Sequence, residues 1–92
     1  MPITTYSTIV AIPEHLACDL AGEAALLNLS NSVYYGLNTV GARIWQLIQA
    51  PVGVLHVRDT LVSEYQVEPA RCEFDLLALL ESLHSEGLIR VQ

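Results

Sequence analysis

The sequence contains no lysine, and its only basic residues apart from histidine are four scattered arginines. Ten acidic residues outweigh them, so the chain has a formal net charge of -6 at pH 7. Proteins that bind a nucleic-acid backbone depend on clustered cations that neutralise phosphates. We therefore expect no nucleic acid among the partners, and instead a partner with an apolar surface or some positive charge.

Cysteine is scarce as well, with Cys18 and Cys72 far apart and in no metal-ligand spacing. Half-buried thiols in a reducing compartment explain them, and a single disulfide between them is the alternative. The N-terminus lacks the charged and then apolar layout of a signal peptide. The longest uncharged run, residues 24–42, is interrupted by asparagine, serine and glycine, unlike a membrane helix. These features predict a cytoplasmic protein with no membrane partner.

Patterns that carry catalysis or bind metals are missing too. The histidines, His15, His56 and His84, lie in separate segments and form no H-x-x-x-H pair. No C-x-x-C, G-x-S-x-G or G-x-G-x-x-G motif occurs. Hydrophobic residues nevertheless make up 52% of the 92 residues, which is typical of a folded domain with a core. We expect a single domain over residues 1–92 that is not an enzyme and holds neither a cofactor nor a metal.

The stretch from Val33 to Trp45 is the most informative part of the chain. Residues 33–35 are β-branched or aromatic and suit a half-buried strand. After Asn38, the apolar residues follow the spacing of one helical face: Val40, Ile44, Trp45 and Ile48. The side-chain oxygen of Asn38 can accept hydrogen bonds from the first free amides of that helix. A strand should therefore run into a helix through an asparagine cap with no loop between them, which would give a ligand site a rigid base.

Turn residues and hydrophobic periodicity divide the rest of the chain into a small sheet followed by helices. Short turns predict an antiparallel meander of strands at residues 16–20, 24–29 and 33–37. Helices are expected at residues 39–49, at 54–65 and from Pro69 to a cap at Gly87, with a final strand at 88–91. Residues 1–15 read as an extended arm or an extra strand. The predicted fold class is α+β, a winged helix-turn-helix-like arrangement with a three-stranded antiparallel sheet packed on three helices.

The predicted third helix has two apolar stripes. A broad stripe suited to the core contains Cys72, Leu76, Leu79, Leu80 and Leu83, and a second one contains Ala70, Phe74 and Leu77. A surface helix usually buries one stripe, so the second needs a partner of its own. Either the sheet covers it, or it forms one side of an open groove beside residues 33–37. That strand carries no lysine or proline to blunt a sheet edge, so an extended peptide could add to it as a further strand.

Residues 26–45, with the sequence LLNLSNSVYYGLNTVGARIW, resemble the PqqD-like family. The family pattern is a strand, a short turn, a tyrosine-rich strand, and then Leu-Asn and Gly-Ala-x-Ile-Trp. A second match covers residues 75–89, with the sequence DLLALLESLHSEGLI. Members of this family are known as precursor-peptide recognition elements, and they serve pathways that modify ribosomally synthesised peptides.

The resemblance implies that a leader peptide binds as an added strand beside residues 33–37 and over the third helix. The peptide-binding positions that it implies are Val33, Tyr34, Tyr35, Gly36, Arg71, Phe74, Asp75 and Ala78. A free-standing chain of this size looks most like the recognition protein of lasso-peptide pathways, which presents the precursor to a leader peptidase. The alternatives are a PQQ-type peptide chaperone that works with a radical enzyme and a DNA-binding winged helix. The protein would act as a monomer or a weak homodimer.

Overall fold

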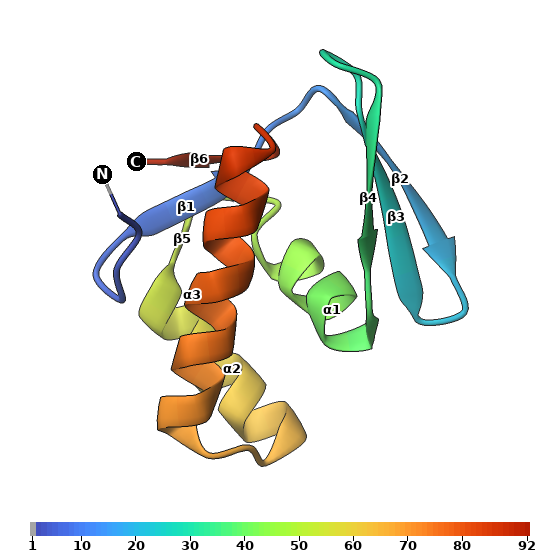
Figure 1. Cartoon of the computed structure of the whole chain (residues 1–92). Coiled ribbons are helices and arrows are strands. Elements are labelled where there is room, and N and C mark those ends of the chain that lie inside the picture. The colour runs from blue at the N-terminus through green and yellow to red at the C-terminus, as the bar shows by residue number, and fades with distance from the viewer. Residues whose placement is uncertain (1) are drawn as a thin grey trace.

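Two three-stranded antiparallel sheets and three helices make up the computed structural model, which describes residues 2–92 (Figure 1). The strands are β1 (Thr8–Ala11), β2 (His15–Leu20), β3 (Glu23–Asn28), β4 (Val33–Leu37), β5 (Val52–Gly53) and β6 (Ile89–Val91). The helices are α1 (Thr39–Leu47), α2 (Val54–Tyr65) and α3 (Pro69–Ser85). The predicted α+β class, with an antiparallel meander followed by three helices, is confirmed.

The meander β2-β3-β4 is held in register by two tight turns. Between β2 and β3, Ala21 and Gly22 both adopt positive φ angles of 54° and 89°, as a type I′ hairpin turn requires. Between β3 and β4, Ser32 donates its amide to Asn28 O at 2.8 Å. The buried Asn28 side chain also donates to Glu86 O at 3.0 Å, which ties this turn to the end of α3.

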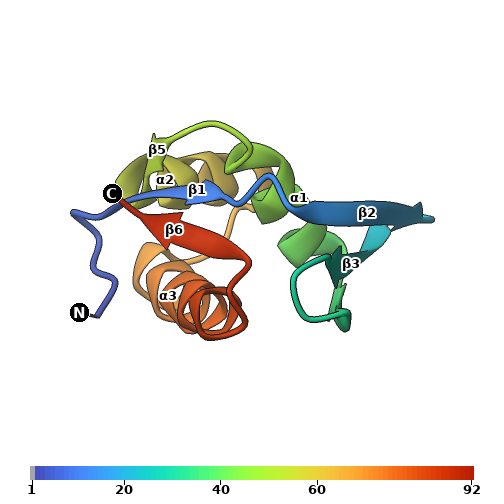
Figure 2. The same cartoon turned by 90° about the horizontal axis from the view of Figure 1, so that it is seen from above.

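A second sheet has the strand order β5-β1-β6 and was not predicted (Figure 2). Figure 2 shows this sheet at one end of the molecule and β2 and β3 at the other. The segment that the sequence left as an arm or an extra strand contributes its central strand, in which Ile9 and Ala11 are buried. Because β1 pairs with strands that begin at Val52 and Ile89, its partners lie far away in the sequence. Local periodicity carries no information about such pairings.

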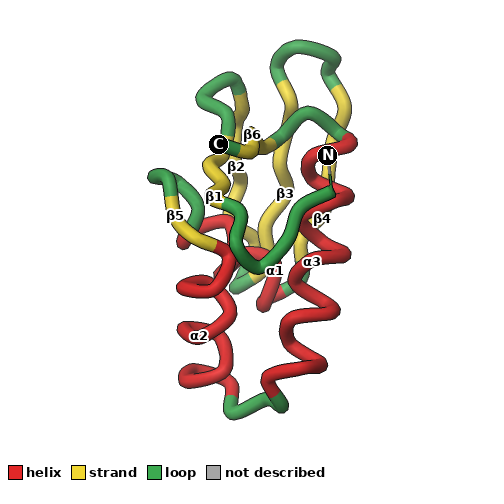
Figure 3. Tube along the Cα trace, turned by 90° about the vertical axis from the view of Figure 1, so that its left-hand side faces the viewer, coloured by secondary structure: helices red, strands yellow, loops and turns green. Residues whose placement is uncertain are grey.

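Two of the three helices, α1 and α3, begin at residues that favour a helix start. Asn38 accepts a hydrogen bond from Gly41 N at 2.9 Å, so β4 does run into α1 through an asparagine cap. Helix α2 starts after Gly53, which offers no side-chain cap. Figure 3 shows α2 and α3 running side by side, joined by a short loop at the foot of the molecule. Helix α3 has Pro69 in its first turn, and Gly87 follows its end with a φ of 71°.

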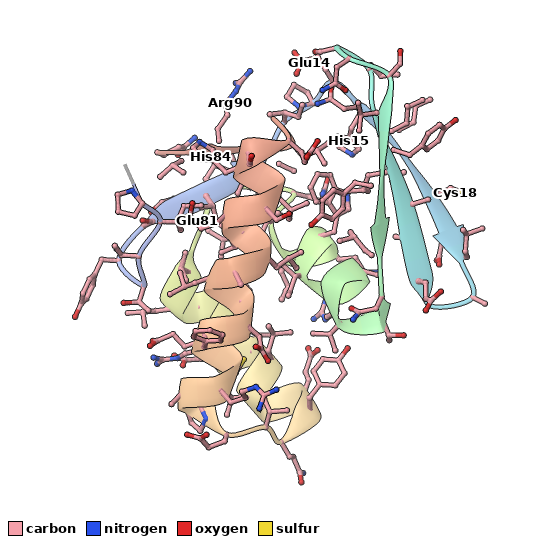
Figure 4. The ribbon with its side chains drawn as sticks, viewed as in Figure 1. Glu14, His15, Cys18, Glu81, His84 and Arg90 are labelled. Carbon is pink, nitrogen blue, oxygen red and sulfur yellow. The ribbon has the colours of Figure 1, made fainter. Side chains whose placement is uncertain are left out.

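Helix α3 supplies the centre of the core. Leu76, Leu80 and Leu83 are almost fully buried and pack with residues of both sheets and of α1 and α2. The second stripe divides: Leu77 packs at the edge of the core, whereas Phe74 points into solvent with 71% of its surface exposed. On the side of α3 away from β4, Glu81 accepts a hydrogen bond from Ile3 N at 2.6 Å (Figure 4). The N-terminal segment, and not the meander, therefore packs against that side of the helix.

The division of the two stripes can be tested by truncation. Leu80→Ala should lower the free energy of unfolding by about 2–5 kcal/mol, because it leaves a cavity in the core. The control Phe74→Ala lies on the same helix and should change it by about 0.5 kcal/mol or less. Urea unfolding followed by circular dichroism measures both values. Equal losses in the two variants would contradict the assignment of Phe74 to the surface.

Candidate functional site

A hollow of about 460 Å³ opens between β4 and α3. The end of β4 and the start of α1 line one side, the end of α2 closes the bottom, and the first half of α3 lines the other side. Its walls are largely apolar, with Ile44, Leu61 and Leu76 among them, while Arg71 and Asp75 stand at the α3 side. We call this hollow, together with the adjoining edge of β4, the β4–α3 groove.

Strand β4 is an edge strand, since β3 is its one neighbour among the strands that the structure describes. Val33–Leu37 contains no charged residue and no proline, the features that usually protect such an edge from pairing. The edge thus keeps hydrogen-bonding groups available for a further strand, and it faces the apolar hollow.

Hydrogen bonding on the other side of β3 shows which backbone groups of β4 are free. Leu29 donates its amide to Glu14 O, one residue before β2, at 3.2 Å. Backbone groups alternate in direction along an antiparallel strand, so odd-numbered residues of β3 point to β2 and even-numbered ones point to β4. Tyr35, the partner of Leu26 in the register, therefore turns its backbone groups into the sheet.

Tyr34 and Gly36 carry the outward-facing backbone groups, because they alternate with Tyr35. Val33 is already occupied, since its amide donates to Asn31 Oδ1 at 3.0 Å. Of the residues expected to pair through their backbone, Val33, Tyr34 and Tyr35, only Tyr34 therefore offers an outward amide. Gly36 offers the second one.

The side chains of β4 alternate between two faces. Tyr35 faces α3, and its hydroxyl lies 2.7 Å from Ser82 Oγ. On the opposite face, Leu16, Leu27 and Tyr34 form a row across the three strands, and Tyr34 is 73% exposed. The three helices lie on the other side of this sheet, and Figure 4 shows Cys18 of β2 away from them. A strand added to β4 would thus meet Tyr34 chiefly through its backbone.

The structure brings together half of the site residues that the sequence indicated. Tyr35, Gly36, Arg71 and Asp75 line the β4–α3 groove. The other four, Val33, Tyr34, Phe74 and Ala78, are exposed and are not among the residues that line it. Their role in binding a peptide stays a prediction.

Several apolar residues of the groove were not among the site residues predicted from the sequence. Val40 and Tyr65 fall on the apolar stripes of α1 and α2, yet they line the hollow and are 40% and 38% exposed. Val67, in the loop before α3, also lines it. An apolar stripe has the same spacing whether it meets the core or an open groove, so no signal in the sequence could have separated the two cases.

Ion pairs hold the helices beneath the groove. Arg43 of α1 donates two hydrogen bonds to the carboxylate of Glu64 in α2, at 2.9 and 2.7 Å. This bonding keeps the pKa of Glu64 below its ordinary value of 4.5. Arg71 and Asp75 form an i,i+4 pair at 3.2 Å that is well exposed, so it contributes little to stability and leaves both charges accessible to a ligand.

Two features that residues 2–92 lack bear on the class of site. No group of three or more histidine, cysteine, aspartate or glutamate side chains in this part of the chain is arranged to hold a metal ion. None of the helices formed by these residues has the length and apolarity needed to span a bilayer.

Comparison with known proteins agrees with this geometry. The family model described as coenzyme PQQ synthesis protein D (PqqD) matches residues 23–89. The chain belongs to the PqqD family. The match spans β3, β4 and all three helices, so the PqqD unit contains every element that lines the β4–α3 groove. The resemblance read from residues 26–45 and 75–89 is thereby confirmed.

Two solved structures related to this PqqD-family chain contain a leader peptide. One is TbiB1 in complex with the TbiA(beta) leader peptide, whose sequence is 28% identical to this chain. The match covers 88% of this chain and 94% of TbiB1, with a TM-score of 0.81. A lasso peptide synthetase B1 complexed with the leader peptide is also 28% identical, covers 89% and 96%, and has a TM-score of 0.71. No curated protein matches the chain.

The Arg43–Glu64 pair predicts a pH dependence of stability. Because the pKa of Glu64 is lowered in the folded state, its contribution is complete above pH 4.5 and is lost as the pH falls through the lowered value. Glu64→Gln should therefore reduce the thermal unfolding temperature at pH 7, and the difference from the wild type should shrink as the pH falls below 4.5. Glu23→Gln, at a carboxylate with no ion pair among residues 2–92, is the control. A Glu64→Gln effect that is independent of pH would refute the role of the pair.

Proposed function

We propose that this protein is a non-catalytic recognition element that binds the leader segment of a ribosomally made precursor peptide. The leader adds as a strand to β4 and lies over α3, and the protein presents it to a processing enzyme. The observation that carries this proposal is the unprotected edge of β4 facing an apolar groove. Both related structures were solved with a leader peptide, which supports the same function.

Backbone hydrogen bonds supply the affinity in this mode of binding, and side-chain pockets supply the specificity. Tyr34 and Gly36 offer their amides and carbonyls to the leader, so two residues of β4 hold it in register. Leader side chains that point inward meet the apolar walls of the groove, and those near its α3 side meet the charges of Arg71 and Asp75.

The precursor and the enzyme define the pathway. Both related structures contain a leader peptide, and one of them is a lasso peptide synthetase B1. This supports a lasso-type pathway, in which a leader peptidase receives the bound precursor. The family name supports a PQQ-type pathway, in which the partner is a radical enzyme. We propose the lasso type, with the protein acting in the cytoplasm, where ribosomal precursors are made, and holding no cofactor. Stimulation of leader cleavage by a purified peptidase would separate the two pathways.

Removal of an outward amide tests strand addition. Gly36→Pro deletes one of the two donors on the free edge of β4, and a proline on an edge strand is compatible with the fold. It should weaken binding of the leader by about tenfold or more. Isothermal titration with the leader segment of a candidate precursor measures the change.

The matched control is Ala17→Pro, which deletes an outward amide at the opposite edge of the same sheet. Its backbone direction follows from the alternation that starts at the Leu29–Glu14 hydrogen bond. Ala17→Pro should leave the affinity within about twofold. Equal weakening in both variants, or unchanged binding in a folded Gly36→Pro variant, would exclude pairing at β4.

Backbone amide shifts locate the peptide independently. On titration with the leader, the shifts should concentrate in β4 and in residues 71–82 of α3. Shifts confined to α2 and the β1 sheet would keep a recognition role but reject the β4–α3 groove as its site. Tight, salt-dependent binding to duplex DNA without peptide binding would support a DNA-binding winged helix instead.

A further inference from the structure

We propose that the Tyr35–Ser82 bridge closes one end of the hollow in the β4–α3 groove and thereby sets a steric pattern on the bound peptide. The residue opposite Tyr35 must be small, whereas the residue opposite Leu37, two positions away, is large and apolar. This inference rests on the proposed function, because it concerns the peptide that adds to β4.

The bridge joins the edge strand to the helix across the groove. The Tyr35 hydroxyl and Ser82 Oγ are 2.7 Å apart, and both side chains are half-buried. Tyr35 also packs against the core, so its ring is held in place at both ends. At this level β4 and α3 are connected, and an inward-pointing side chain of an added strand has little room.

The groove is open on the other side of the bridge. Leu37 is two residues further along β4, and the hollow of about 460 Å³ extends from there past Val40 towards the end of α2. Leu79 lines the α3 side at one turn from Ser82. The space is much larger than a single side chain needs, and its apolar walls favour burial of an aliphatic or aromatic residue.

The register of the free edge connects these two levels with the peptide. If the added strand runs antiparallel to β4, hydrogen-bonded pairs form at Tyr34 and Gly36, and the residues opposite Tyr35 and Leu37 are in non-hydrogen-bonded pairs. In such pairs the side chains of the two strands approach most closely. Since Tyr35 and Leu37 point inward, the peptide side chains opposite them point inward as well. One of them meets the bridge and the other enters the hollow.

A large residue opposite Tyr35 would have to break the bridge to bind. The loss of one hydrogen bond corresponds to a weakening of about five- to tenfold. The expected pattern in the peptide is therefore a small residue and a large apolar residue separated by one position. In an antiparallel peptide the large residue comes first.

Selection from a displayed library of random ten-residue peptides, with the full-length protein as bait, tests this pattern. The wild type should enrich peptides with a small residue and a large apolar residue at positions two apart. Ser82→Ala frees the tyrosine side chain, and Tyr35→Ala removes its ring. Both variants should keep the large residue and lose the preference for the small one. Ser85→Ala, an exposed serine on the same helix, is the control and should select as the wild type does.

A direct measurement complements the selection. One enriched peptide is synthesised with alanine and with leucine at the small position, and both are titrated against the wild type and Ser82→Ala. Leucine should weaken binding about five- to tenfold in the wild type and by no more than about twofold in Ser82→Ala. An equal penalty in both proteins, or enrichment of large residues at both positions, would overturn the inference. If the wild type enriches no peptide at all, the proposed function itself fails, and the two failures are thus distinguishable.

Discussion

The packing of one stripe of α3 is the constraint on which the rest of the structure depends. Leu76, Leu80 and Leu83 lie in the centre of the core and contact elements from both sheets. Because these residues point inward, the neighbouring face of α3, with Arg71 and Asp75, is turned towards β4 and stays partly open. The β4–α3 groove is therefore a direct consequence of how the core is filled.

Two polar contacts fix the distance between α3 and the β2-β3-β4 meander. Asn28, at the end of β3, donates to the backbone near the end of α3, and Tyr35 reaches Ser82 from β4. At the opposite end of β4, the Asn38 cap joins the strand to α1 without a loop. The edge strand is thus held at both ends, so a peptide added to it would lose less conformational freedom from the protein side than one bound by a flexible loop.

An exposed edge with an apolar hollow beside it is a hazard for a small protein, because other chains can pair with it. Here β4 ends in a helix after five residues, and α3 stands beside it. The net charge of -6 adds mutual repulsion between copies. A protein that must keep one edge open for a peptide can tolerate it when the edge is short and the copies repel each other.

Much of the secondary structure could be predicted from the sequence, because the signals that specify it are local. The meander, α1 with its Asn38 cap, and the bounds of α2 follow from turn residues, caps and periodicity, all of which act within a few residues. The family could be named from residues 26–45 and 75–89 for the same reason. The position of Tyr35 and Arg71 in one groove was indicated only through that resemblance. The two residues lie 36 positions apart in the sequence, so no local pattern connects them.

The remaining features depend on contacts between segments that are distant in the sequence. The β5-β1-β6 sheet depends on pairing between distant segments, and no local pattern identifies the partners of β1. The exposure of Phe74, the open face of Val40 and Tyr65, and the outward amides of Tyr34 and Gly36 depend on which neighbours are present in space. The local elements and their order follow from the amino-acid sequence, because caps, turns and periodicity act over a few residues. Which apolar surfaces were buried and which were left as a groove was decided by packing, because it depends on contacts between segments that the chain order does not specify.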